Sequence, residues 1–184
     1  MTNQTKEPWG EGTPWKSSTA FFTYLRGCLR KAWVRHPAKL TLLNKKRYQI
    51  PNPNPRGNKP TIWGADCVKC KGTFPIKDIQ IDHATPAGSL QCIEDIQGFA
   101  ERLLCVRAED LRTVCKECNS ALALSDKQKI SYEEAINIKR VISLEKEKTV
   151  VSFITAAGLV PASNAKARRQ QALDILNAVS AKEV

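Results

Sequence analysis

The chain has 184 residues, of which 42% are hydrophobic and 7% aromatic, which is enough for a domain with a real core. All of its apolar runs are shorter than the roughly 18 residues that span a membrane, and its polar N-terminus lacks the apolar segment of a signal peptide. We therefore expect a soluble protein of the cytoplasm, which excludes the membrane-embedded and secreted classes.

The net charge of +11 is concentrated in the first third of the chain. Residues 1–60 hold 12 Lys or Arg and 2 Asp or Glu, whereas the remaining residues hold 17 and 16. A one-sided basic segment suits a polyanion, because neutralising phosphates releases counterions. We expect nucleic acid as the partner. The alternative is a solvated basic arm without a partner.

Residues 1–62 form the first predicted region, a basic arm with one helix and a proline-rich linker. Residues 1–16 lack periodicity, which indicates disorder. From Ser17 or Ser18 to Pro37, apolar side chains recur at three- and four-residue spacing and predict a helix. The prolines of "PNPNPRGNKP" favour an extended linker, so this helix is expected to be a separate appendage. The basic side chains expected to contact nucleic acid here are Arg26, Arg30, Lys31, Arg35, Lys45, Lys46 and Arg47.

Residues 63–128 form the second predicted region and carry two C-x-x-C pairs, Cys67 with Cys70 and Cys115 with Cys118. Two such pairs make a tetrahedral zinc site of four thiolates the natural interpretation. The 44 residues between the pairs exceed the spacing of a compact zinc ribbon, so the metal would hold the base of a larger inserted unit. Unliganded thiols and a redox pair are the alternatives. The other cysteines are expected to be small buried hydrophobes; they are Cys28, Cys92 and Cys105.

The inserted unit contains the adjacent residues Asp82 and His83. The alternation in "IKDIQID" predicts a strand ending at this pair, followed by a short helix and a second strand at 111–114. A further helix is expected to begin at the second cysteine pair, with Asn119 directly after it. Asp82 and Asn119 offer hard oxygen ligands that suit Mg²⁺, and a neutral His83 beside such an ion can take a proton from water. A lone Asp–His pair is more often structural, with the carboxylate satisfying the ring.

The pattern C-x2-C … DH … C-x2-C-N resembles the HNH, or ββα-metal, endonucleases, and is most similar to the recombination endonuclease VII branch of tailed phages. The resemblance covers roughly residues 18–130. It implies an α+β fold, a zinc-stapled ββα-metal finger flanked by N- and C-terminal helices, in a protein of the host cytoplasm. It implies His83 as general base, Asp82 and Asn119 as ligands of Mg²⁺ or Mn²⁺, and the four paired cysteines as zinc ligands. DNA hydrolysis would leave a 5′-phosphate and a 3′-hydroxyl.

The chain departs from this family at two supporting positions. Relatives often carry a histidine where Thr85 stands and an acidic residue where Leu122 stands, and the chain has no asparagine between His83 and Cys115. The alternative function is therefore a non-catalytic zinc module that binds nucleic acid or regulates a phage nucleic-acid machine.

Residues 129–184 form the third predicted region, which is helical. Ser131 and Glu134 form a capping box, Gly158 can end a second helix, and Ser163 can cap a third. Basic residues at a helix start do not complement the macrodipole, so Arg168 and Arg169 are expected to face phosphate, although a solvated helix face is the commoner arrangement. These helices can also supply the interface of a homodimer.

Overall fold

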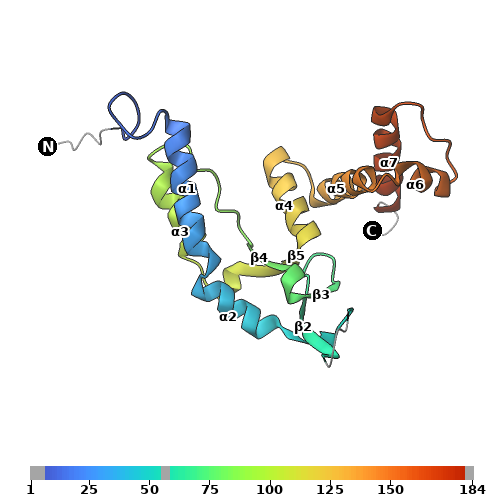
Figure 1. Cartoon of the computed structure of the whole chain (residues 1–184), viewed down its shortest axis with the longest axis horizontal. Helices are drawn as coiled ribbons and strands as arrows, with labels where there is room; N and C mark the ends of the chain where they lie inside the picture. The colour runs from blue at the N-terminus through green and yellow to red at the C-terminus, as the bar shows by residue number, and fades with distance from the viewer. Residues whose placement is uncertain (1–6, 55–58, 181–184) are drawn as a thin grey trace. The chain divides into compact units, whose positions relative to one another are not determined.

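The computed structural model describes residues 7–54 and 59–180, which form an α+β chain of two compact units divided between Val114 and Cys115 (Figure 1). The first unit contains α1 (Ser18–Val34), α2 (Pro37–Lys46), α3 (Asp95–Leu104), β1 (Tyr48–Pro51), β2 (Thr61–Asp66), β3 (Thr73–Pro75), β4 (Ile79–His83) and β5 (Leu111–Cys115), whose last residue opens the second unit. The second unit contains α4 (Lys116–Gln128), α5 (Tyr132–Lys146), α6 (Val150–Ala156) and α7 (Ala165–Ser180). The predicted α+β class is confirmed. Within the described residues, no helix is both long enough and apolar enough to cross a membrane.

Helix α1 forms over the predicted stretch and packs into the core of the first unit. The hydroxyl oxygen of Ser17 caps it by accepting a backbone N–H of the first turn at 3.3 Å. Phe22 is buried in one cluster with Leu90, Phe99 and Leu103, and Figure 1 shows α1 and α3 side by side. The helix is therefore not the separate appendage that the proline-rich stretch suggested, because its apolar stripe is needed to cover α3.

The segment before α1 is ordered over residues 7–16, where disorder was predicted. Trp9 and Trp15 form an isolated β-bridge, and the Trp9 ring lies 5.4 Å from that of Phe22. The two tryptophans pack on the helix and supply apolar contacts. The segment is otherwise polar, which is why its sequence indicated disorder. Residues 1–6, also predicted to be disordered, lie outside the described residues.

A three-stranded antiparallel sheet follows α2 and was not predicted. Strand β1 pairs with β2, and β2 with β3. The proline-rich stretch connects β1 to β2, and Asn52 donates its backbone N–H to the Pro60 carbonyl at 2.8 Å beside the last strand pair. A Cβ atom on Gly64 would lie 2.5 Å from Cδ1 of Ile50, so the buried Ile50 side chain fills the space that a larger residue at position 64 would need.

Strands β4 and β5 form a separate two-stranded sheet that carries the Asp82–His83 pair. Both were predicted, although residues 76–78 form a 3₁₀ turn and the strand begins only at Ile79. Ile81 of β4 and Leu111 of β5 pack on Leu42 of α2 in one buried cluster. This packing determines which face of β4 is turned toward α2. Because side chains alternate along a strand, Asp82 and His83 point to opposite faces.

The second unit is helical, as predicted. Ser131 caps α5 by accepting the backbone N–H of Glu134 at 3.0 Å, and α6 is followed by Gly158 with φ +79°. Val141, Val150, Ile154 and Ala172 form the buried cluster between α5, α6 and α7.

The cap of α7 differs from the prediction. Asn164, and not Ser163, accepts the first-turn N–H at 2.8 Å. Serine and asparagine are nearly equivalent at this position, so the sequence alone does not separate two neighbours of these types.

Candidate functional site

The four paired cysteines converge into one cluster. The Sγ atoms of Cys67, Cys70, Cys115 and Cys118 all lie within 4.8 Å of one another, and three of these residues are buried while Cys70 is exposed. Tetrahedral zinc with Zn–S bonds of about 2.3 Å separates its sulfur ligands by about 3.8 Å. Four soft thiolates at this spacing fit a structural zinc ion, and the predicted ligand set is confirmed as a group able to hold a metal.

The first cysteine pair lies in a tight turn between β2 and β3. Cys67 donates its backbone N–H to the Gly72 carbonyl and accepts the N–H of Lys71 at its own carbonyl, both at 2.9 Å. Lys71 has φ +61°, a left-handed conformation that is uncommon outside glycine and lets the chain reverse within the turn. The turn brings both thiols to the same side of the chain.

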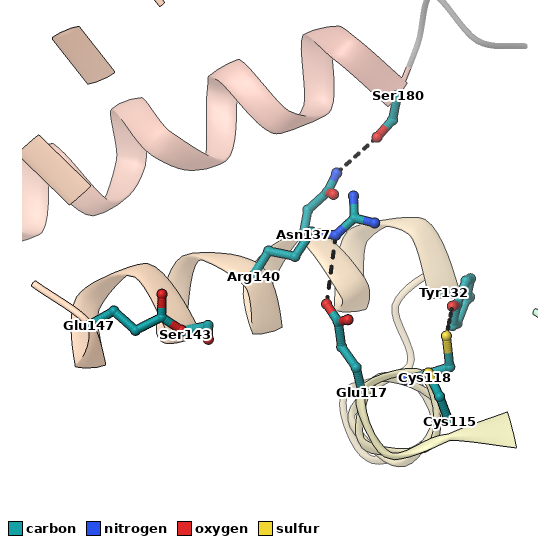
Figure 2. A network of polar contacts seen from close by, with 9 residues as sticks. All are labelled: Cys115, Glu117, Cys118, Tyr132, Asn137, Arg140, Ser143, Glu147 and Ser180. Atoms are coloured by element: carbon teal, nitrogen blue, oxygen red, sulfur yellow. Dashed lines mark hydrogen bonds and ion pairs between the residues drawn. The ribbon is translucent and has the colours of Figure 1, made fainter. Parts of the chain in front are cut away.

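The second cysteine pair lies where β5 passes into α4. Cys115 is the N-cap of α4, and its Sγ accepts the backbone N–H of Cys118 at 3.4 Å. The hydroxyl of Tyr132, at the start of α5, donates to Sγ of Cys118 at 3.0 Å (Figure 2). Donors directed at thiolate sulfur reduce the excess negative charge of a Cys₄ site and fix the orientation of its ligands.

The remaining cysteines are not buried. Cys92 and Cys105 are exposed and Cys28 is half-buried, so the prediction of three small core residues was wrong. Cys92 precedes α3 and Cys105 ends it, and neither position faces the apolar side of the helix.

His83 is held at the end of β4 by two contacts. It is 9% exposed, its Nε2 lies 3.0 Å from the Leu103 carbonyl oxygen, and its ring centroid lies 4.2 Å from that of Trp33. Because a carbonyl only accepts, Nε2 must carry the proton of this hydrogen bond, and the neutral ring keeps its lone pair on Nδ1. The contacts therefore fix both the orientation and the tautomer of the imidazole.

His36 occupies a comparable place. Its Nε2 donates to the Leu104 carbonyl at 2.9 Å, and its ring lies 5.4 Å from that of Trp33. Its Nδ1 is buried without a hydrogen-bond partner, which is not the case for Nδ1 of His83. The two imidazoles thus share one kind of contact, and Nδ1 of His36 is the one that is buried without a partner.

Asp82 does not contact the neighbouring imidazole. Its Oδ2 accepts from Nε of Arg112 at 3.0 Å and from Nη2 at 2.8 Å, an ion pair across β4 and β5. The carboxylate therefore does not satisfy the ring, as the structural alternative supposed; the Leu103 carbonyl has that role, while Asp82 pairs with Arg112. The sequence gives no sign of Arg112 as the partner, because 30 positions separate the two residues.

A cavity of about 620 Å³ opens directly after His83. Its lining includes Ala84 and Thr85 from the segment after β4, Glu101 and Arg102 from α3, and Glu109 and Asp110 before β5. Thr85, at a position where the resemblance expects a histidine, is thus beside this cavity.

Asn119 lies in the first turns of α4, one residue after Cys118, and is half-buried. It belongs to the second unit, whereas Asp82 and His83 belong to the first. The shared metal site of Asp82 and Asn119 stays a prediction.

The nine basic residues expected at nucleic acid divide into two groups. Arg26 donates to the Leu90 carbonyl, Arg168 to the Ala162 and Ser163 carbonyls, and Arg169 pairs with Glu145. The others are exposed, with the Arg47 guanidinium over the Trp63 ring; they are Arg30, Lys31, Arg35, Lys45, Lys46 and Arg47. The exposed group lies on α1, on α2 and on the residue that directly follows each of these helices.

Comparisons with models of protein families, with curated proteins and with solved structures found no match for this chain.

Proposed function

We propose that the protein is a zinc-stabilised, metal-dependent DNA endonuclease of the HNH type. The observation that carries the proposal is the fixed imidazole of His83. Its Nε2 is engaged by the Leu103 carbonyl, so the neutral ring presents Nδ1 as a base. A general base needs a defined orientation and a lone pair; the Leu103 and Trp33 contacts support the first, and in the neutral ring the second is on Nδ1.

In this proposal each group of residues has a separate role in DNA cleavage. Asp82 and Asn119 would hold Mg²⁺ or Mn²⁺, which would supply positive charge at the scissile phosphate and the leaving oxygen. His83 takes a proton from the attacking water through Nδ1. The exposed basic residues of α1 and α2 hold the DNA backbone. Zinc at the four cysteines is structural and fixes Cys118, and with it Asn119, at the start of α4.

A second candidate, a non-catalytic zinc module that binds nucleic acid, is favoured by the ion pair of Asp82. Two donors of Arg112 already occupy Oδ2 of this carboxylate and neutralise its charge. To ligate a metal, Asp82 must share or release these bonds. A protein that only binds nucleic acid has no such requirement.

Cleavage of supercoiled plasmid DNA distinguishes the two candidates. With Mg²⁺ or Mn²⁺ we expect the wild type to nick or cut, and His83→Ala to lower the rate at least about 100-fold, the usual contribution of a general base. His36→Ala is the matched control, because it removes an imidazole that donates to the next carbonyl and lies beside the same Trp33. All variants are compared at equal zinc content.

Equal rates for wild type and His83→Ala would contradict the catalytic assignment. Binding of DNA without cleavage of plasmid or branched substrates would establish the non-catalytic module instead. Loss of activity in both histidine variants would show that the histidines support the end of α3 and not the chemistry.

A further inference from the structure

An exposed aromatic and basic surface lies at one end of the three-stranded sheet. Gln49 of β1 is the register partner of Trp63 of β2, so the two side chains share one face. The Arg47 guanidinium lies 4.6 Å from the centroid of the Trp63 ring. Trp63 is nevertheless 46% exposed, which is a large exposed fraction for an indole in a sheet.

The stretch of chain that carries this surface is basic. No Asp or Glu occurs between Glu11 and Asp66, and Lys45 and Lys46 are exposed directly before Arg47. Asp66 itself accepts hydrogen bonds from the Tyr48 and Thr73 hydroxyls. Asp66 alternates with Trp63 along β2, so its carboxylate points to the opposite face of the sheet.

A half-exposed indole beside a guanidinium suits one class of ligand in particular. The flat face of a nucleobase stacks on tryptophan and on arginine, and neighbouring lysines neutralise the phosphates of the same strand. In a duplex the faces of the bases are already stacked, so only an unpaired base can use such a surface.

We propose that Arg47 and Trp63 form a stacking platform for an unpaired base, with Lys45 and Lys46 on the flanking phosphates. The proposal rests on the proposed function and specifies its substrate as nucleic acid with a single-stranded stretch. Neither the zinc centre nor His83 takes part in the platform, so it can be tested by binding alone.

The test compares the binding of a labelled 20-nucleotide oligothymidylate and a 20-base-pair duplex without added Mg²⁺, by fluorescence anisotropy. We expect Trp63→Ala to weaken binding to the oligothymidylate about tenfold or more and to leave duplex binding within about twofold. Trp63→Phe keeps a stacking ring and should retain most of the affinity. Leu159→Ala is the control, because Leu159 is an apolar side chain of similar exposure, 48%, in the second unit.

Equal loss on both ligands in Trp63→Ala, or loss on neither, would overturn the platform. If the wild type cleaves plasmid and Trp63→Ala binds oligothymidylate normally, the platform alone fails. If the wild type binds neither ligand, the platform and the proposed nuclease fail together. Trp63→Phe also serves if Trp63→Ala does not fold, since equal affinity of Trp63→Phe and a Trp63→Leu variant would exclude stacking.

Discussion

His36 and His83 each donate an imidazole N–H to a carbonyl at the end of α3, Leu104 and Leu103 respectively. The last carbonyls of a helix lack intrahelical donors, so both histidines stabilise the end of this helix. Their surroundings differ, since Nδ1 of His36 is buried without a partner, whereas His83 is the more buried residue as a whole. The same kind of hydrogen bond thus holds both imidazoles, and in the proposed function only that of His83 acts as a base.

The hydrogen bond from Tyr132 to a cysteine of the candidate zinc site provides a prediction at the scale of a residue. Tyr132→Phe keeps the ring but removes the hydroxyl that donates to Cys118 at 3.0 Å. We expect the zinc affinity to fall about tenfold, as is usual when a partner of a metal ligand is lost. Competition with a chromophoric chelator measures it, with Tyr24→Phe on the exposed side of α1 as control. Equal affinities of Tyr132→Phe and wild type would show that this bond does not support the site.

At the scale of elements, α3 is joined to the loop before it through Asp95. Its Oδ2 accepts the backbone N–H of Gln91 at 2.8 Å and of Cys92 at 3.2 Å, and these bonds lower the pKa of the carboxyl. Because the folded-state pKa lies below the unfolded-state value, the stabilisation is complete above the unfolded value. It is lost as the pH falls through the folded value.

Asp95→Asn is therefore expected to unfold at a lower temperature than the wild type near pH 7, where the carboxylate is charged. The difference should shrink in acid, once the wild-type carboxyl is protonated too. Thermal unfolding followed by circular dichroism between pH 2 and pH 7 measures this. A difference that does not change with pH would mean that the charge of Asp95 does not contribute.

The elements that the sequence predicted share strong local signals. The periodicity of α1, the alternation of β4 and the serine cap of α5 each depend on neighbouring residues, and each was confirmed. The sheet of β1, β2 and β3 was missed because the prolines beside β1 indicated a linker. The sheet is stabilised by pairing between strands, which no local pattern in the sequence shows. The same limit applies to Arg112, whose pairing with Asp82 depends on the register of two distant strands.

At the scale of the whole molecule, the cysteines are the part of the site that spacing predicted well. Two C-x-x-C pairs separated by 44 residues converge within 4.8 Å, because a tight turn holds the first pair and a helix start holds the second. A structural zinc ion supplies about 10 to 16 kcal/mol of binding free energy in small domains. The proposed site depends on it, since Asn119 directly follows a zinc ligand.

The most direct test of this dependence is the metal content of the purified chain, measured together with the absorption spectrum after replacement of zinc by Co²⁺. We predict one zinc ion per chain and a Co²⁺ spectrum with thiolate charge-transfer bands and the strong visible bands of tetrahedral coordination. Cys118→Ser should weaken both signals, and Cys92→Ser, which changes an exposed cysteine outside the cluster, should change neither. A chain that folds without zinc, or a spectrum that Cys118→Ser leaves unchanged, would contradict the zinc centre and the nuclease site built on it.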